Sequence, residues 1–166
     1  SLHIPCEAYH GGMTPKKRKE IHNKYASGQI KCIVATLAFG MGIDQNIHLV
    51  IHYGLPGDME SYYQEIGRAG RDGVESKCIL FWDKKDMMVS KMLLKDIADP
   101  KYKLYKEQQV KLMERFMLTK ECRKKMILEH FDEVLKGKCM KCDNCLLQKK
   151  KKQEEILNYK ILNYPT

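Results

Sequence analysis

Short apolar runs alternate with amphipathic segments along the first half of the chain. Runs rich in Ile, Val and Tyr predict strands at residues 4–9, 30–35, 47–53 and 76–82, the last three of them buried. A first helix is predicted to begin at Thr14 and Pro15, which are residue types that start a helix, and to end at Gly28. A second helix is predicted over 58–71, capped by Asp58. This alternation predicts an α/β fold with a parallel sheet flanked by helices.

The second half of the chain has a different pattern. Apolar residues recur at helical spacing through 84–134, which predicts two helices packed as a hairpin around a break at Leu118 and Thr119. Lysines such as Lys103 and Lys111 cover the outer faces, where they contact either a phosphate backbone or only solvent. Residues 148–166 begin with a run of lysines and are interpreted as a linker toward a further domain.

Residues 64–73 read QEIGRAGRDG, and they contain two of the five arginines in a chain with 30 basic residues. On a continuous helix, Gln64, Arg68 and Arg71 share one face. Guanidinium forks bind phosphate oxygens through two parallel hydrogen bonds, which Lys cannot do. The pattern favours a phosphate-facing stripe, and the alternative is a solvated helix face with ion pairs to Glu65 and Asp72.

The totals narrow the class of protein. A chain of 166 residues with 43% hydrophobic content can form a hydrophobic core. A net charge of +9 favours a polyanionic partner, and nucleic acid is favoured over a membrane. The alternative is a basic surface that only keeps the protein soluble. No secretory signal is visible at the beginning of the sequence, so we expect a protein that is not secreted. Seven cysteines, an odd number, favour a reducing compartment over a disulfide framework.

Four of the cysteines have metal-ligand spacing, C-x16-C-x2-C-x2-C, and they are Cys122, Cys139, Cys142 and Cys145. Four thiolates bind Zn²⁺ tetrahedrally and leave no open position, so the pattern predicts a structural zinc site. The alternatives are an iron–sulfur cluster and unrelated structural cysteines. Cys6, Cys32 and Cys78 fall in predicted strands and are interpreted as small buried apolar residues.

Residues 36–44 form a predicted loop after a strand, at the edge where open α/β sheets place their ligands. Its two glycines, Gly40 and Gly42, allow a phosphate to come close, although an ordinary turn explains them equally well. The sequence contains no G-x-x-x-x-G-K-[ST] loop, so we expect no complete nucleotide site of that type in these residues.

These segments together resemble the RecQ DNA helicases of superfamily 2, nearest to the Werner-type eukaryotic members. The matching stretches are AYHGGM at 8–13, VATLAFGMGID at 34–44, SYYQE with GRAGRDG at 61–73, and the cysteine spacing. The resemblance implies that residues 1–98 are most of a second RecA-like helicase lobe, without its opening strand and helix. It also implies that 99–147 are a small helical zinc-binding subdomain and that 148–166 are a basic linker.

The resemblance implies an ATP-driven motor, with Mg²⁺, that unwinds duplex DNA with 3′ to 5′ polarity in replication, recombination or repair. By motif, Arg71 is the arginine finger and Arg68 and Gln64 also face the γ-phosphate. The same motifs place Asp44 near the ribose and assign Gly42 to the nucleotide site. Thr36, His10 and Gly11 are expected to hold the phosphates of the tracking DNA strand.

The expected partners are single-stranded DNA and duplex junctions, together with the first RecA-like lobe of the same protein. Without that lobe these residues are expected to be inactive as an ATPase. We expect a nuclear location in a eukaryote and a cytoplasmic one otherwise. A non-catalytic zinc module that binds DNA or a protein remains the main alternative, and a related enzyme that acts on RNA is a further one.

Overall fold

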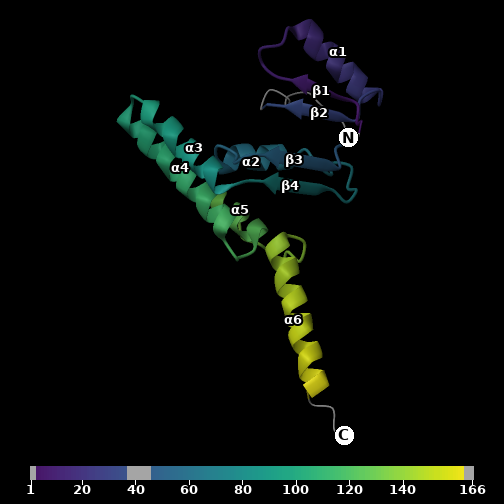
Figure 1. Ribbon diagram of the computed structural model, residues 1–166, viewed down its shortest axis with the longest axis vertical. Coiled ribbons are helices and arrows are strands. Elements are labelled where there is room, and N and C mark those ends of the chain that lie inside the picture. The colour runs from purple at the N-terminus through teal and green to yellow at the C-terminus, as the bar shows by residue number, and fades with distance from the viewer. Residues whose placement is uncertain (1–2, 37–45, 163–166) are drawn as a thin grey trace. The chain divides into compact units, whose positions relative to one another are not determined.

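The computed structural model describes residues 3–36 and 46–162, with the backbone alone from 155 to 162 (Figure 1). The chain forms two compact units, of which the first comprises Ser1–Tyr53 and Ser61–Phe81 and the second comprises Gly54–Glu60 and Trp82–Thr166. The predicted boundary at residue 98 stays a prediction. No helix among the described residues is both long enough and apolar enough to cross a bilayer.

The first strand pair of unit one is joined by a helix. β1 (Cys6–Tyr9) pairs in parallel with β2 (Cys32–Ala35), and α1 (Pro15–Ala26) connects them. Thr14 caps α1 as predicted, because its hydroxyl accepts a hydrogen bond from the backbone N–H of Lys17 at 3.3 Å. Ile21 of α1 is completely buried and anchors this helix in the unit.

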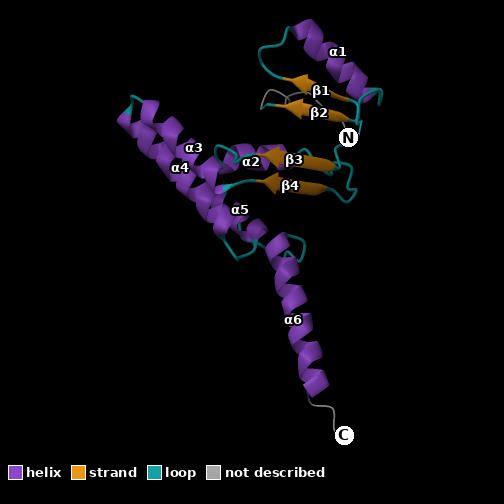
Figure 2. Ribbon diagram, in the orientation of Figure 1, coloured by secondary structure: helices purple, strands orange, loops and turns teal. Residues whose placement is uncertain are grey.

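The second strand pair has the same construction. β3 (Leu49–Tyr53) pairs in parallel with β4 (Lys77–Phe81), and α2 (Met59–Ile66) lies between them in sequence. Figure 2 shows that the two strands within each pair point the same way. Parallel strands joined through helices confirm the predicted α/β class.

The expectation of buried strands is wrong for the described residues. Val34, Leu49, Ile51 and Phe81 are each more than half exposed. Each described sheet has only two strands, so every strand lies at an edge and lacks a neighbour on one side. For the same reason the three strand cysteines are not small core residues: Cys6 and Cys78 are exposed, and Cys32 is half-buried.

Unit two is helical, as predicted for 84–134. It contains α3 (Lys84–Leu93), the short 3₁₀ helix η1 (Leu94–Asp96), α4 (Pro100–Leu118), α5 (Arg123–His130) and α6 (Asp143–Leu162). The predicted break is confirmed, since α4 ends at Leu118 and α5 begins at Arg123. Side chains of α4 and α5 fill the core of this unit, among them Met113, Phe116, Met126 and Ile127.

The linker predicted after residue 147 stays a prediction, and the structure shows that α6 continues through this segment to Leu162. The residues of α6 are mostly Lys, Gln, Glu and Leu, which have high helix propensity, and neither Gly nor Pro interrupts them. A Lys150–Glu154 pair at 4.0 Å adds a contact one turn apart. A run of lysines is therefore compatible with a helix as well as with a linker.

Candidate functional sites

The structure brings the four predicted cysteines together. The sulfurs of Cys122, Cys139, Cys142 and Cys145 all lie within 4.8 Å of one another, and the Cys122 and Cys142 sulfurs are 3.9 Å apart. Four sulfurs at about 2.3 Å from a tetrahedral Zn²⁺ would be about 3.8 Å from each other. The donor set and its spacing therefore fit zinc.

Local backbone features place each sulfur. Cys122 is the N-cap of α5, and its sulfur accepts a hydrogen bond from the backbone N–H of Lys125 at 3.5 Å. Met140 adopts a left-handed φ of 55°, which turns the chain between Cys139 and Cys142. Cys145 lies in the first turn of α6. Cys122 and Cys145 are thus both placed by the start of a helix.

The thiols of Cys142 and Cys145 differ in pKa. Burial by itself raises the pKa of Cys142, but hydrogen bonds from the backbone N–H groups of Cys145 and Arg123 and from neighbouring thiols lower this pKa to about 7. The hydrogen bond to Cys142, together with burial, raises the pKa of Cys145 to about 12. One thiolate is stabilised while its neighbour keeps its proton, and a bound cation is what allows all four to ionise together.

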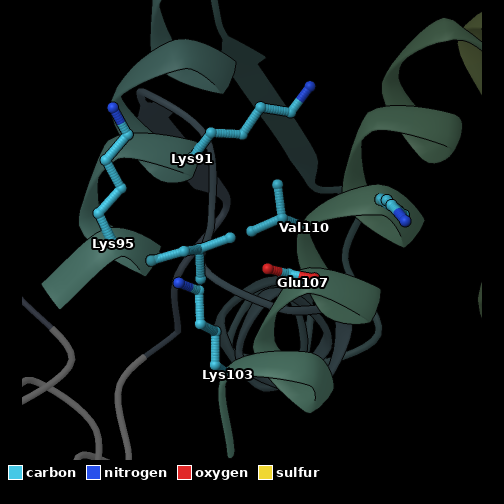
Figure 3. A pocket seen from close by; sticks show the side chains of 7 residues that line it. Lys91, Lys95, Lys103, Glu107 and Val110 are labelled. Atoms are coloured by element: carbon cyan, nitrogen blue, oxygen red, sulfur yellow. The ribbon is translucent and has the colours of Figure 1, made fainter. Parts of the chain in front are cut away.

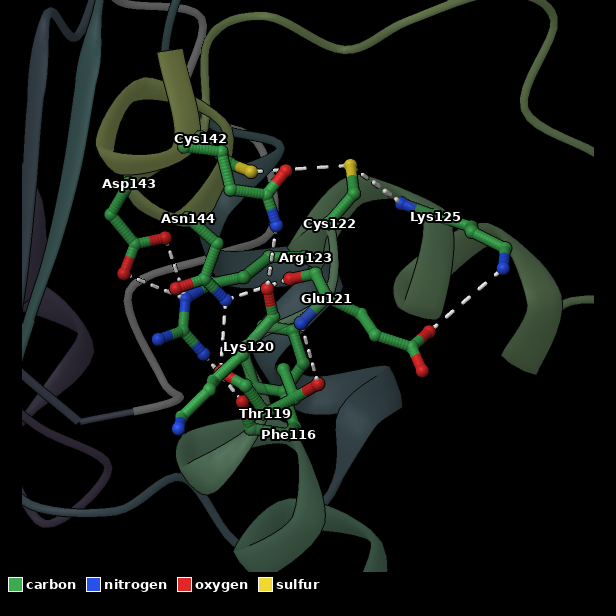
Figure 4. Close-up of polar contacts among 11 residues, drawn as sticks. Phe116, Thr119, Lys120, Glu121, Cys122, Arg123, Lys125, Cys142, Asp143 and Asn144 are labelled. Atoms are coloured by element: carbon green, nitrogen blue, oxygen red, sulfur yellow. Dashed lines mark hydrogen bonds and ion pairs between the residues drawn. The ribbon is translucent and has the colours of Figure 1, made fainter. Parts of the chain in front are cut away.

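A set of polar contacts that the sequence did not predict braces the cluster (Figure 4). Arg123 binds the Asp143 carboxylate with Nε at 2.7 Å, and it also donates a hydrogen bond to the carbonyl of Phe116. The side-chain amide of Asn144 donates to the carbonyls of Thr119 and Glu121 at 2.9 and 2.7 Å. These contacts hold the 116–123 segment against the start of α6. The only sequence signal for them is the Asp-Asn pair inside the final C-x2-C.

The arginine segment differs from the predicted helical stripe. α2 ends at Ile66, so Gln64 is on the helix while Arg68 and Arg71 lie in the turns that follow. The chain leaves the helix because Ala69 forms a parallel bridge with Ile47, and the backbone N–H of Gly70 donates to the Ile47 carbonyl at 2.9 Å. The expectation of one continuous helix over 58–71 is therefore wrong.

Glu65 and Asp72 pair with histidines in the structure. The Glu65 carboxylate is 2.6 Å from Nε2 of His52, and the Asp72 carboxylate is 2.8 Å from Nε2 of His48. Nε of Arg71 donates to the Gly67 carbonyl at 3.3 Å, and no carboxylate among the described residues lies within 4 Å of its guanidinium group. The exposed Arg71 thus has most of its donors available to a ligand.

The residues predicted to contact DNA lie at one edge of the first strand pair. His10 directly follows β1 and Thr36 directly follows β2, and the last residues of these strands, Tyr9 and Ala35, are register partners. His10, Thr36 and Gly11 are all exposed. The structure thus brings these three residues to the same carboxyl edge. Gly42 and Asp44 lie outside the described residues, so their predicted roles stay predictions.

Comparison with known protein families finds a matching domain in each half of the chain. The helicase conserved C-terminal domain matches residues 1–73, and the RecQ zinc-binding domain matches residues 84–146, which include all four clustered cysteines. The two matches occur in that order along one chain.

Three relatives match most of the chain. The bifunctional 3′-5′ exonuclease/ATP-dependent helicase WRN of Mus musculus is 45% identical, over 87% of this chain and 11% of the relative. A protein of Acanthamoeba polyphaga mimivirus, provisionally named ATP-dependent RNA helicase R290, is 41% identical over 86% and 26%. The ATP-dependent DNA helicase RecQ of Bacillus subtilis (strain 168) is 40% identical over 82% and 23%.

This chain spans between about a tenth and about a quarter of the length of these relatives. Its helicase C-terminal match covers β1, β2 and β3, whose described residues belong to parallel strand pairs joined through helices, and its four-cysteine cluster lies within the matched zinc-binding domain. The chain belongs to the RecQ family of helicases.

Proposed function

We propose that these residues are the second motor lobe and the zinc-binding subdomain of an ATP-dependent helicase that unwinds duplex DNA with 3′ to 5′ polarity, in replication, recombination or repair. The observation that carries the proposal is the succession of a helicase C-terminal domain and a RecQ zinc-binding domain in one chain. Two relatives that match more than four fifths of this chain are named ATP-dependent helicases. The zinc has a structural role because its four cysteines leave no open ligand position.

In this proposal Arg71 is the arginine finger. Phosphoryl transfer spreads negative charge over oxygens of the γ-phosphate, and a planar guanidinium group stabilises that charge by paired hydrogen bonds. Arg71 is exposed and its charge is not neutralised by a described carboxylate, which supports this role. Arg68 and Gln64 are proposed to contact the same phosphate group. ATP with Mg²⁺ would bind between this lobe and the first RecA-like lobe.

The carboxyl edge of β1 and β2 is the proposed DNA contact of this lobe. The hydroxyl group of Thr36, the imidazole of His10 and the backbone of Gly11 can each contact phosphate oxygens. Contacts of this kind do not select between bases. Their common position at one edge supports a contact with successive phosphates of a single strand.

The test uses the longer protein that contains both lobes. Arg71→Lys and Arg71→Ala should lower DNA-stimulated ATP hydrolysis by roughly 10³- to 10⁵-fold and abolish unwinding, while ATP and single-stranded DNA binding stay within about twofold. Arg115→Lys, at an exposed arginine of α4, is the matched control and should keep normal turnover. Normal hydrolysis in either Arg71 variant would refute the finger assignment.

The same assay separates the alternatives. Unwinding is measured on DNA and RNA duplexes of identical sequence. Unwinding of RNA alone would replace DNA as the substrate, in line with the name of the mimivirus relative. A longer protein that binds nucleic acid but shows no ATP hydrolysis would support the non-catalytic zinc module instead.

A further inference from the structure

A pocket in unit two lies apart from the cysteine cluster. It occupies about 310 Å³ between α3, η1 and α4, and it is lined by Lys91, Leu94, Lys95, Lys103, Glu107, Val110 and Lys111. Figure 3 shows lysines from both sides of the pocket around Val110 and Glu107. None of these residues belongs to the proposed nucleotide or zinc sites or to the DNA contact at β1 and β2, although Lys103 and Lys111 are among the lysines for which the sequence left a phosphate-backbone contact open.

The rim of the pocket is strongly basic. Four lysines and a single carboxylate residue, Glu107, are among the residues that line it. Lys91 pairs with Glu114 at 2.6 Å, but within the described part of the chain no carboxylate lies within 4 Å of the ammonium groups of Lys95, Lys103 or Lys111. Like charges gathered around one cavity raise the local positive potential, so an anionic occupant lowers the energy of this arrangement.

The floor of the pocket is aliphatic. It is formed by Leu94 and by the buried Val110, and no aromatic ring or guanidinium group lines the cavity. Nucleic-acid bases bind by stacking on aromatic rings or arginine and by hydrogen bonds to their edges, and this floor offers neither. A volume of about 310 Å³ is at the small end of ligand pockets and suits one large apolar side chain.

We propose that this pocket binds an acidic peptide segment of a partner protein, in which one large apolar side chain enters the cavity and flanking Asp or Glu residues pair with the lysines. The apolar anchor supplies affinity through burial, and the carboxylates supply orientation and a faster encounter. This inference is independent of the helicase proposal, because the pocket shares no residue with it.

The test measures binding of a fluorescein-labelled peptide with a single Phe between two runs of Asp and Glu to the zinc-loaded chain, by fluorescence anisotropy. The double variant Lys95→Glu with Lys103→Glu should weaken binding by at least about tenfold, because two attractive contacts become repulsive. Lys101→Glu is the matched control on the same helix outside the pocket and should change affinity by less than about twofold. The peptide with Ser in place of Phe should also lose at least about tenfold.

Zinc content and thermal melts check that each variant is folded. Lys103→Gln removes a positive charge without adding a negative one, so it should lower peptide affinity by less than the double variant does. Wild-type affinity in the folded double variant would overturn the proposal, as would equal binding of the Phe and Ser peptides. Single-stranded DNA is the competing probe. If the double variant lost DNA affinity and the peptide did not bind, the pocket would be a nucleic-acid contact and the proposal would fail.

Discussion

Gly70 is the position where a single methyl group should disturb the arginine segment most. Its backbone has a left-handed φ of 70°, and it donates a hydrogen bond to Ile47 that sets where the chain turns after α2. A Cβ atom at this position would lie 2.6 Å from Oγ of Ser76 and 3.2 Å from the carbonyl oxygen of Val74. Gly70→Ala therefore combines an unfavourable backbone conformation with a steric clash.

Gly73 provides the matched control, because its φ of 76° is similar and a Cβ there would have no atom within 4 Å. The left-handed conformation costs an L-residue roughly 1–2 kcal/mol, and the reduced freedom of the unfolded chain returns about 0.4–1 kcal/mol. Gly73→Ala should then lower the free energy of unfolding by at most about 1.6 kcal/mol. Gly70→Ala adds a forced rotation of Ser76 and a tight carbonyl contact, so a total of about 2–3 kcal/mol is expected.

Amide hydrogen exchange of β3 and β4 measures this effect, because it reports the local opening free energy even when two units unfold separately. Ser76→Ala in the Gly70→Ala background should recover about 1 kcal/mol, since it removes the closest clashing atom. If Gly70→Ala were no more destabilising than Gly73→Ala, the steric reasoning would be wrong.

Three further predictions concern the zinc cluster and one histidine pair. Cys142→Ser should lose the zinc ion by elemental analysis and destabilise unit two, because such sites contribute on the order of 10 kcal/mol to folding, whereas Cys78→Ser should keep the metal. Asn144→Ala leaves two backbone carbonyls without their donor, so it should cost about 2 kcal/mol in chemical denaturation and speed zinc loss to a chelator. The hydrogen bond from His48, followed by that from the Val74 N–H, lowers the pKa of Asp72 below its ordinary value of 3.8. The resulting stability is present above that pH and is lost as the pH falls through the lowered pKa, so Asp72→Asn should flatten the acid limb of a melting-temperature profile, and an unchanged profile would contradict the assignment.

Features that depend on chemistry within a few residues could be predicted from the sequence. Thr14 and Pro15 start α1 because a side-chain cap and a fixed φ act within one turn of the helix. The cysteine spacing predicted the metal cluster because the tight C-x2-C-x2-C loop can bring three sulfurs close together without help from distant residues. The alternation of strands and helices gave the α/β class for the same reason, since each element is encoded by its own periodicity.

Features that depend on backbone groups far apart in the sequence could be recognised only in the folded structure. Helical spacing places Gln64, Arg68 and Arg71 on one face, yet Ile47 captures the backbone of Ala69 and Gly70 and ends α2 at Ile66. The pairing of Glu65 with His52 likewise joins residues of a helix and a strand whose register no local pattern specifies. A helix forms from contacts within a few residues, whereas these interactions arise only after the strands have paired, and their energy then outweighs the local preference.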